Sequence, residues 1–106
     1  SEDGILVNID GNSNRVSAIS FGPKKVLFIV GMNKLAKDLD AAVSRARNIA
    51  APANIQRFDV KTPCKELGTC MNCKSKDCIC CNVLITRFQR DPERVHVILV
   101  NEDLGF

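Results

Sequence analysis

All six cysteines of this 106-residue chain lie in one short segment, "CKELGTCMNCKSKDCICC", which runs from Cys64 to Cys81. Thiols gathered this closely can bind a metal, form local disulfides or carry out redox chemistry. The spacing Cys70-x-x-Cys73 lets two thiolates reach one ion from a single turn, and Cys64 with one later cysteine would complete a tetrahedral set. Sulfur ligands without a nearby histidine favour zinc or an iron–sulfur cluster.

Two other interpretations of this segment stay open. Disulfides here would close only local loops, whereas a disulfide scaffold needs cysteines distributed along the fold. A redox-active CxxC usually follows a strand at the start of a helix, but this one lies in a lysine-rich stretch. We therefore favour a metal site over a disulfide or plain thiol loop, and both over catalytic thiol chemistry.

A second candidate site is the stretch "NIDGNSNR", where an apolar run turns through Asp10-Gly11 toward a short helix. Free N–H groups at a helix start can bind a carboxylate or phosphate, although a cap by Asn12 or Ser13 would also satisfy them. A similar corner, "VGMNK", follows the next apolar run, and strand ends of this kind line the ligand crevice of parallel sheets. The residues expected to bind a small anionic metabolite are Asp10, Gly11, Asn12, Asn14, Arg15, Asn33 and Lys34.

The elements that position these residues alternate along the chain. Apolar runs of strand length occur four times, at 5–9, 24–31, 82–88 and 94–100. Helices are predicted at 15–21 and, behind an Asn33 cap, at 35–49, with Pro52 stopping or restarting the second one. Residues 61–81 form the cysteine-rich loop. This order predicts one α/β domain over residues 1–106, with a largely parallel sheet and flanking helices.

Composition narrows the classes of function. A net charge of +3 and 5% aromatic residues do not indicate a nucleic-acid partner. No apolar run has the length of a membrane span, so we expect no membrane partner. The chain as it stands shows no leader, and its cysteines do not form the distributed pattern of a disulfide scaffold. Together these features indicate a cytoplasmic protein. His96, the only histidine, is expected to be a packed or edge residue, and no general base is evident, so the sequence leaves open whether the protein is an enzyme.

The stretches "DGNSNRV", "FGPKKV", "GMNK" and "RNIAAP", together with the cysteine segment, resemble the lactate-utilisation (LUD) domain family, and most closely its YkgG-type branch. The resemblance implies a fold similar to part of a NagB/RpiA/CoA-transferase-like domain and a role in organic-acid (lactate) metabolism. It also implies Cys64, Cys70, Cys73 and Cys80 as metal ligands, with Cys78, at a position where the family usually has arginine, as the alternative fourth ligand. The alternative function is a metal-stabilised protein-interaction module without catalytic activity.

The resemblance further implies that the chain corresponds to the C-terminal half of a longer domain. Half of an α/β unit leaves sheet edges and apolar surface exposed. We therefore expect a homo-oligomer or pairing with a missing N-terminal segment.

Overall fold

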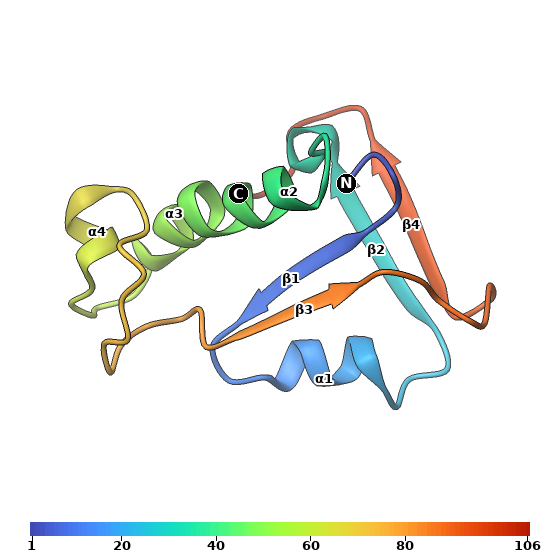
Figure 1. The fold of residues 1–106 in the computed structure, drawn as a ribbon, viewed down its shortest axis with the longest axis horizontal. Helices are drawn as coiled ribbons and strands as arrows, with labels where there is room; N and C mark the ends of the chain where they lie inside the picture. The colour runs from blue at the N-terminus through green and yellow to red at the C-terminus, as the bar shows by residue number, and fades with distance from the viewer.

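The computed structural model describes residues 1–106 and contains two separate two-stranded sheets (Figure 1). In the first, β1 (Leu6–Asp10) pairs antiparallel with β3 (Asn82–Thr86). In the second, β2 (Val26–Gly31) pairs parallel with β4 (Val95–Val100). The predicted α/β class is confirmed, but the expected single, largely parallel sheet is wrong. An apolar run predicts a strand without specifying its partner, and here each strand pairs with one far away in the sequence.

The short helix α1 (Asn14–Ser20) covers the β1–β3 sheet. Its two buried residues, Val16 and Ile19, are three positions apart and so lie on one face of the helix. Figure 1 shows α1 below this sheet, directly after the turn that ends β1. The turn therefore places the start of α1 beside the end of β1.

A longer helical segment forms the other layer. It comprises α2 (Leu39–Arg45), a π-helical stretch (Ala46–Ala50) and α3 (Ala51–Ile55). It begins at Asp38, whose carboxylate accepts a hydrogen bond from the N–H of Ala41 at 2.9 Å, so the predicted Asn33 cap is wrong. A separate 3₁₀ turn, Met32–Lys34, precedes it. Pro52 lies in the first turn of α3, directly after the π-helical stretch. The helical segment continues through it without a break, so the predicted stop or restart at Pro52 is wrong.

The predicted loop over residues 61–81 contains one short helix, α4 (Pro63–Leu67), and is otherwise irregular. Two side chains tie it to the long helical segment. Arg47 donates to the amide oxygen of Asn72 at 2.7 Å, and Gln56 donates to the backbone oxygen of Lys65 at 2.9 Å. Asn72 has a φ of 52°, in the left-handed region that asparagine tolerates better than most residues. The cysteine segment is therefore anchored to the long helical segment within α4 and again at Asn72, after α4 has ended.

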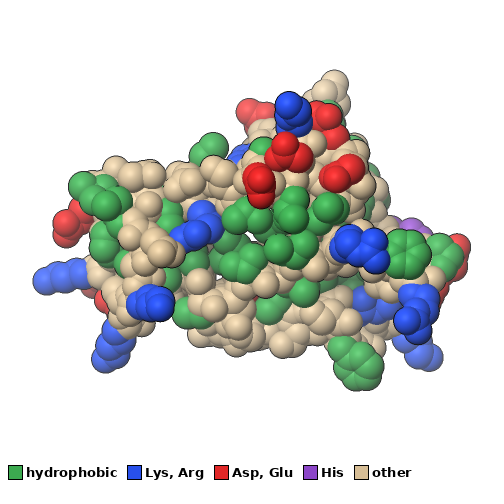
Figure 2. Space-filling view, viewed as in Figure 1, with side chains coloured by type: hydrophobic (Ala, Val, Ile, Leu, Met, Phe, Trp, Pro, Cys, Tyr) green, Lys and Arg blue, Asp and Glu red, His purple; other side chains and the backbone are tan.

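The buried core is small. Only eight of the 106 residues are buried, and among the large aliphatic residues Ile55 alone is fully enclosed. The radius of gyration is 14.2 Å, against about 13 Å for a compact domain of this length. Figure 2 shows apolar side chains gathered at the surface between β1 and the helices. No helix has the length and apolar character needed to cross a membrane.

Candidate functional site

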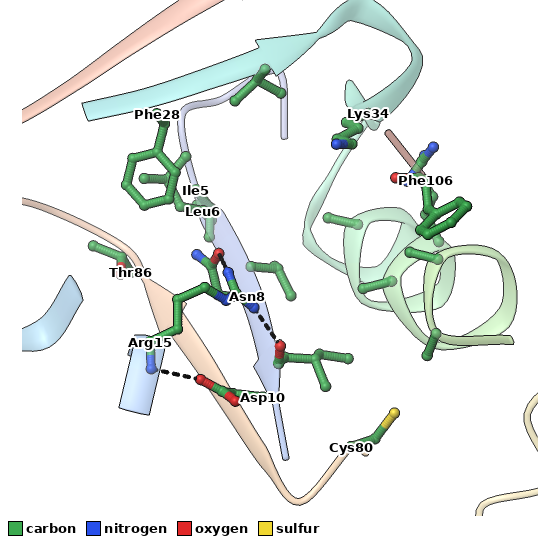
Figure 3. A pocket seen from close by; sticks show the side chains of 18 of the residues that line it. Ile5, Leu6, Asn8, Asp10, Arg15, Phe28, Lys34, Cys80, Thr86 and Phe106 are labelled. Atoms are coloured by element: carbon green, nitrogen blue, oxygen red, sulfur yellow. Dashed lines mark hydrogen bonds between the residues drawn. The ribbon is translucent and has the colours of Figure 1, made fainter. Parts of the chain in front are cut away.

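A cavity of about 1210 Å³ lies between β1, β2 and the long helical segment (Figure 3). It brings together parts of both predicted sites, which are far apart in the sequence. From the two ligand corners and the cysteine loop, the predicted residues that line it are Asp10, Gly11, Asn12, Arg15, Lys34, Cys78 and Cys80. The predicted residues that do not line it are Asn14, Asn33, Cys64, Cys70 and Cys73.

The carboxylate of Asp10 occupies the start of α1. One of its oxygens accepts the N–H groups of Arg15 at 2.9 Å and Val16 at 3.1 Å, and the other accepts the N–H of Asn12 at 3.2 Å. Ser13 holds the N-cap position in a left-handed conformation, with φ 65°, and its side chain makes no capping bond. The expected cap by Asn12 or Ser13 is therefore wrong. The helix start is already satisfied by an internal anion and offers no free N–H cluster to a ligand.

The surroundings of Asp10 also change its acidity. Desolvation raises the pKa of its carboxyl, but hydrogen bonds from the N–H groups of Val16, Asn12 and Arg15 and the positive charge of Arg15 outweigh this effect. The net result is a pKa below the ordinary value of 3.8. Asp10 therefore remains a carboxylate at neutral pH and is unsuited to be a general acid there.

The guanidinium of Arg15 is held by two acceptors on β1. It donates to the side-chain oxygen of Asn8 at 3.0 Å and to the backbone oxygen of Ile9 at 2.6 Å. A guanidinium has five N–H donors, so three remain for other partners. Figure 3 shows Arg15 between Asn8 and Asp10, with the apolar side chains of Ile5, Leu6 and Phe28 along the adjoining wall. Asn8 was not predicted; its signal is a single polar residue inside the apolar run "ILVNI".

The second predicted corner holds the C-terminal segment of the chain. The side chain of Asn33 accepts the N–H of Leu104 at 3.1 Å and donates to the backbone oxygen of Gly105 at 3.3 Å. Arg45 in turn donates to the backbone oxygen of Asn33 at 2.8 Å and lines the cavity. Lys34 also lines the cavity, across from Arg15 (Figure 3). Asn33 thus has an internal structural role here, while Lys34 and the unpredicted Arg45 contribute positive charge to the cavity.

All six cysteines of the loop are free thiols, five of them half-buried and Cys81 exposed. Burial, and then the neighbouring thiols of Cys78, Cys70 and Cys64, raise the pKa of Cys80 to about 12. Cys73 lies beside Ser75, with 3.6 Å between its sulfur and the hydroxyl oxygen. Hydrogen bonds from the backbone and side chain of Ser75 lower the pKa of Cys73. Burial similarly raises the pKa of the Cys78 thiol.

The thiols are suitable donors for a soft metal, but their positions do not converge. No group of three or more His, Cys, Asp or Glu side chains is placed so that it could hold one metal ion. The arrangement of the cysteine loop therefore does not fit a metal without movement of the loop. The site of Cys64, Cys70, Cys73 and Cys80, with Cys78 as the alternative ligand, stays a prediction.

The fold and the cavity define a small α/β domain with one large opening of mixed apolar and cationic character. Comparison with protein families finds that residues 1–100 match the LUD domain. The chain belongs to the LUD domain family, which is related to lactate utilisation. No curated protein sequence and no solved structure matches the chain.

Proposed function

We propose that the cavity binds a small carboxylate of organic-acid metabolism and that Arg15 is its anchor. The observation that carries this proposal is the fixed position of the Arg15 guanidinium at the cavity wall, between Asn8 and Ile9, with donors to spare. Family membership supports the link to lactate metabolism. The motifs "DGNSNRV" and "FGPKKV" support placement in the YkgG-type branch, with its NagB/RpiA-like fold.

The electrostatics of the site support an anionic ligand. The carboxylate of Asp10 is engaged by backbone N–H groups, so the spare donors of Arg15 can contact a ligand carboxylate with two parallel hydrogen bonds. Lys34 and Arg45 add positive charge along the same cavity, which attracts anions from solution. The apolar wall formed by Leu6 and Phe28 suits the carbon skeleton of an organic acid better than a bare phosphate.

The site supports binding rather than turnover by this chain. His96 is exposed, does not line the cavity, and has its Nε2 within 2.9 Å of the backbone oxygen of Glu93. The low pKa of Asp10 makes it a weak base at neutral pH. We therefore propose that the protein serves lactate-related metabolism as a binding component.

Calorimetric titration with lactate, pyruvate, inorganic phosphate and a sugar phosphate tests the proposal. Arg15→Ala removes the guanidinium, and we expect it to weaken carboxylate binding about tenfold or more, because a charge-assisted contact contributes roughly 1.5–3 kcal/mol. Arg15→Lys should recover part of the affinity, since it restores the charge without the planar pair of donors.

Arg90→Ala is the matched control, because Arg90 is exposed and lies outside the cavity lining. It removes the same charge and should leave affinity unchanged within about twofold, since distant surface charges are screened by salt. Equal affinities of wild type and Arg15→Ala would eliminate Arg15 as the anchor. Tighter binding of inorganic phosphate than of lactate would contradict the proposed ligand class.

The alternative function is a metal-stabilised interaction module. The observation that favours it is that all six thiols are free and lie in one loop, which Arg47 holds against the helices through Cys70. Zinc or an iron–sulfur cluster would draw these thiols together and order the loop. Metal analysis, described below, separates this function from the first.

A further inference from the structure

Two further cations lie together in the cavity, away from Arg15. Arg45 donates to two backbone oxygens at 2.8 and 3.2 Å, and a guanidinium has five N–H donors, so three remain. One of these two acceptors is Phe106. The Nζ of Lys34 adjoins the preceding residue, Gly105, where a Cβ would be 2.9 Å from it. Figure 3 shows Lys34 next to Phe106 and well away from Arg15.

Neither of these cations forms an ion pair within the chain. Lys34 and Arg45 are both half-buried, and the ammonium of Lys34 makes no hydrogen bond. Of the carboxylates that line the cavity, Asp10 is held by the start of α1, Asp77 accepts a backbone N–H at 3.2 Å, and Glu2 is exposed. A charge that is partly removed from water without a partner is unfavourable, so this end of the cavity favours an added anion.

The wall that joins the two cationic ends is apolar. Arg15 is fixed to β1 and Arg45 lies on α2, and these two elements pack against each other. The cavity volume of about 1210 Å³ exceeds the roughly 300–1,000 Å³ of pockets for drug-sized ligands, so it accommodates a longer carbon chain than that of lactate. The apolar residues that β1, α2 and the following π-helical turn contribute to the lining are Leu6, Val7, Ile9, Ala42 and Ala46.

We propose that the ligand of this cavity is a dicarboxylate, an inference that rests on the proposed binding of a carboxylate by Arg15. The second carboxylate binds Lys34 and Arg45, and the carbon chain between the two groups lies along the apolar wall. Both contacts form at once only when the ligand spans the distance between the two ends, so the cavity selects for chain length. A monocarboxylate occupies one end alone and binds more weakly.

The second end suits a carboxylate better than a phosphate. Phosphates are commonly bound by free backbone N–H groups at a turn or helix start. In the turn after β2, however, the N–H of Met32 is bonded to the backbone oxygen of Glu102, and the N–H of Leu35 to that of Met32. The donors that remain at this end are side-chain cations, and the guanidinium of Arg45 has the planar geometry that matches a carboxylate.

Calorimetric titration of the whole chain with acids of matched length tests the proposal. The dicarboxylates are succinate, adipate and suberate, and the monocarboxylates with the same numbers of carbon atoms are butyrate, hexanoate and octanoate. At one of these lengths the dicarboxylate should bind about tenfold or more tightly than its matched monocarboxylate, because it adds a second charge-assisted contact. Its advantage should be smaller at the other lengths, since non-specific attraction of a doubly charged ion does not depend on such a fit.

Lys34→Ala should lower the ratio of dicarboxylate to monocarboxylate affinity severalfold, and Lys34→Arg should retain most of it because the charge is kept. Since Lys34 makes no hydrogen bond within the chain, we expect both variants to fold, and circular dichroism checks this. Lys37→Ala is the matched control, because Lys37 is exposed and lies outside the cavity lining. It should change neither affinity by more than about twofold.

The outcomes separate this inference from the proposed function. Dicarboxylates that bind no more tightly than matched monocarboxylates at any length overturn the inference, while Arg15 can still be the anchor of a monocarboxylate. An affinity ratio that Lys34→Ala leaves unchanged also overturns it. Tighter binding of phosphoglycolate than of every dicarboxylate would assign the second end to a phosphate and contradict the dicarboxylate. Absence of any carboxylate binding, or equal affinities of wild type and Arg15→Ala, overturns the proposed function and this inference together.

Discussion

Asp10 and Arg15 flank one short turn, and the two charged side chains have different roles there. Asp10 accepts three backbone N–H groups at the start of α1, and Arg15 donates back to Asn8 and Ile9 on β1. The acidic residue therefore stabilises the strand–helix junction, and the basic residue keeps donors for a ligand. The anion expected at the helix start is supplied by the protein itself.

The lowered pKa of Asp10 predicts a dependence of stability on pH. A depressed carboxyl pKa contributes stability above the unfolded-state value, 3.8, and this contribution is lost as pH falls through the lower folded-state pKa. Asp10→Asn should therefore destabilise the protein at pH 7, and the gap from wild type should shrink as pH falls below 3.8. Urea unfolding of both proteins at several pH values measures this gap.

Asp59→Asn is the control for the loss of one exposed carboxylate, because Asp59 makes no hydrogen bond in the structure. It should cost less stability at pH 7 than Asp10→Asn does. A gap between wild type and Asp10→Asn that stays constant from pH 7 to pH 3 would contradict the role assigned to this carboxylate.

At the scale of elements, the turn after β2 must let the C-terminal segment pass close to the backbone. Met32 donates its N–H to the backbone oxygen of Glu102 at 3.1 Å, and Asn33 holds Leu104 and Gly105. Gly31 lies at this crossing and is buried. The motif "VGMNK" is thus a docking point for the chain terminus, and within it Val30 and Lys34 line the cavity.

Gly31→Ala should disrupt this crossing. A Cβ atom at position 31 would lie 2.5 Å from the nitrogen of Leu104 and 2.7 Å from the oxygen of Glu102, so the backbone must move. We expect a loss of about 1–3 kcal/mol in the free energy of unfolding. In Gly11→Ala the new Cβ would meet the backbone of Ile79 at 3.4 Å, and this variant should lose less stability. Equal stabilities of the two variants in urea unfolding would show that the crossing tolerates a side chain.

The cysteine loop is the element on which metal binding can be decided. We expect protein prepared without oxygen to hold one metal site per chain, brown for an iron–sulfur cluster and colourless for zinc. Because that site requires the loop to move, metal removal should also change the near-ultraviolet circular dichroism. Cys70→Ser should abolish binding, and Cys81→Ser, at an exposed thiol outside the predicted set, should retain it. Fewer than about 0.2 metal equivalents with six titratable thiols would eliminate the metal site.

At the scale of the whole molecule, the two sheets do not share one core. Buried residues cluster in α1, with Val16 and Ile19, and around α3, with Ala51 and Ile55, while β2 and β4 contribute only Gly31. Burial of apolar surface is the main stabilising contribution in folding, so the β2–β4 half of the chain gains less stability from burial than the half that holds α1 and α3.

The sequence by itself determined the properties that depend on neighbouring residues. The apolar runs predicted all four strands to within a few residues, and the α/β class followed from their alternation with helices. Family membership was also predictable, because "DGNSNRV" and the cysteine spacing are local patterns. In each case the signal lies within a few residues of the feature it predicts.

The tertiary structure decided the properties that depend on residues far apart. Strand pairing joins β1 to β3 and β2 to β4, and an apolar run is compatible with any of these partners. Asp10, rather than Asn12 or Ser13, satisfies the start of α1 because the turn folds its carboxylate back over the helix. The proximity of Arg15 and Cys80 in one cavity likewise follows from chain packing. Several local conformations and strand partners have similar free energies, and tertiary packing determines which of them forms. A local sequence pattern therefore cannot predict the outcome.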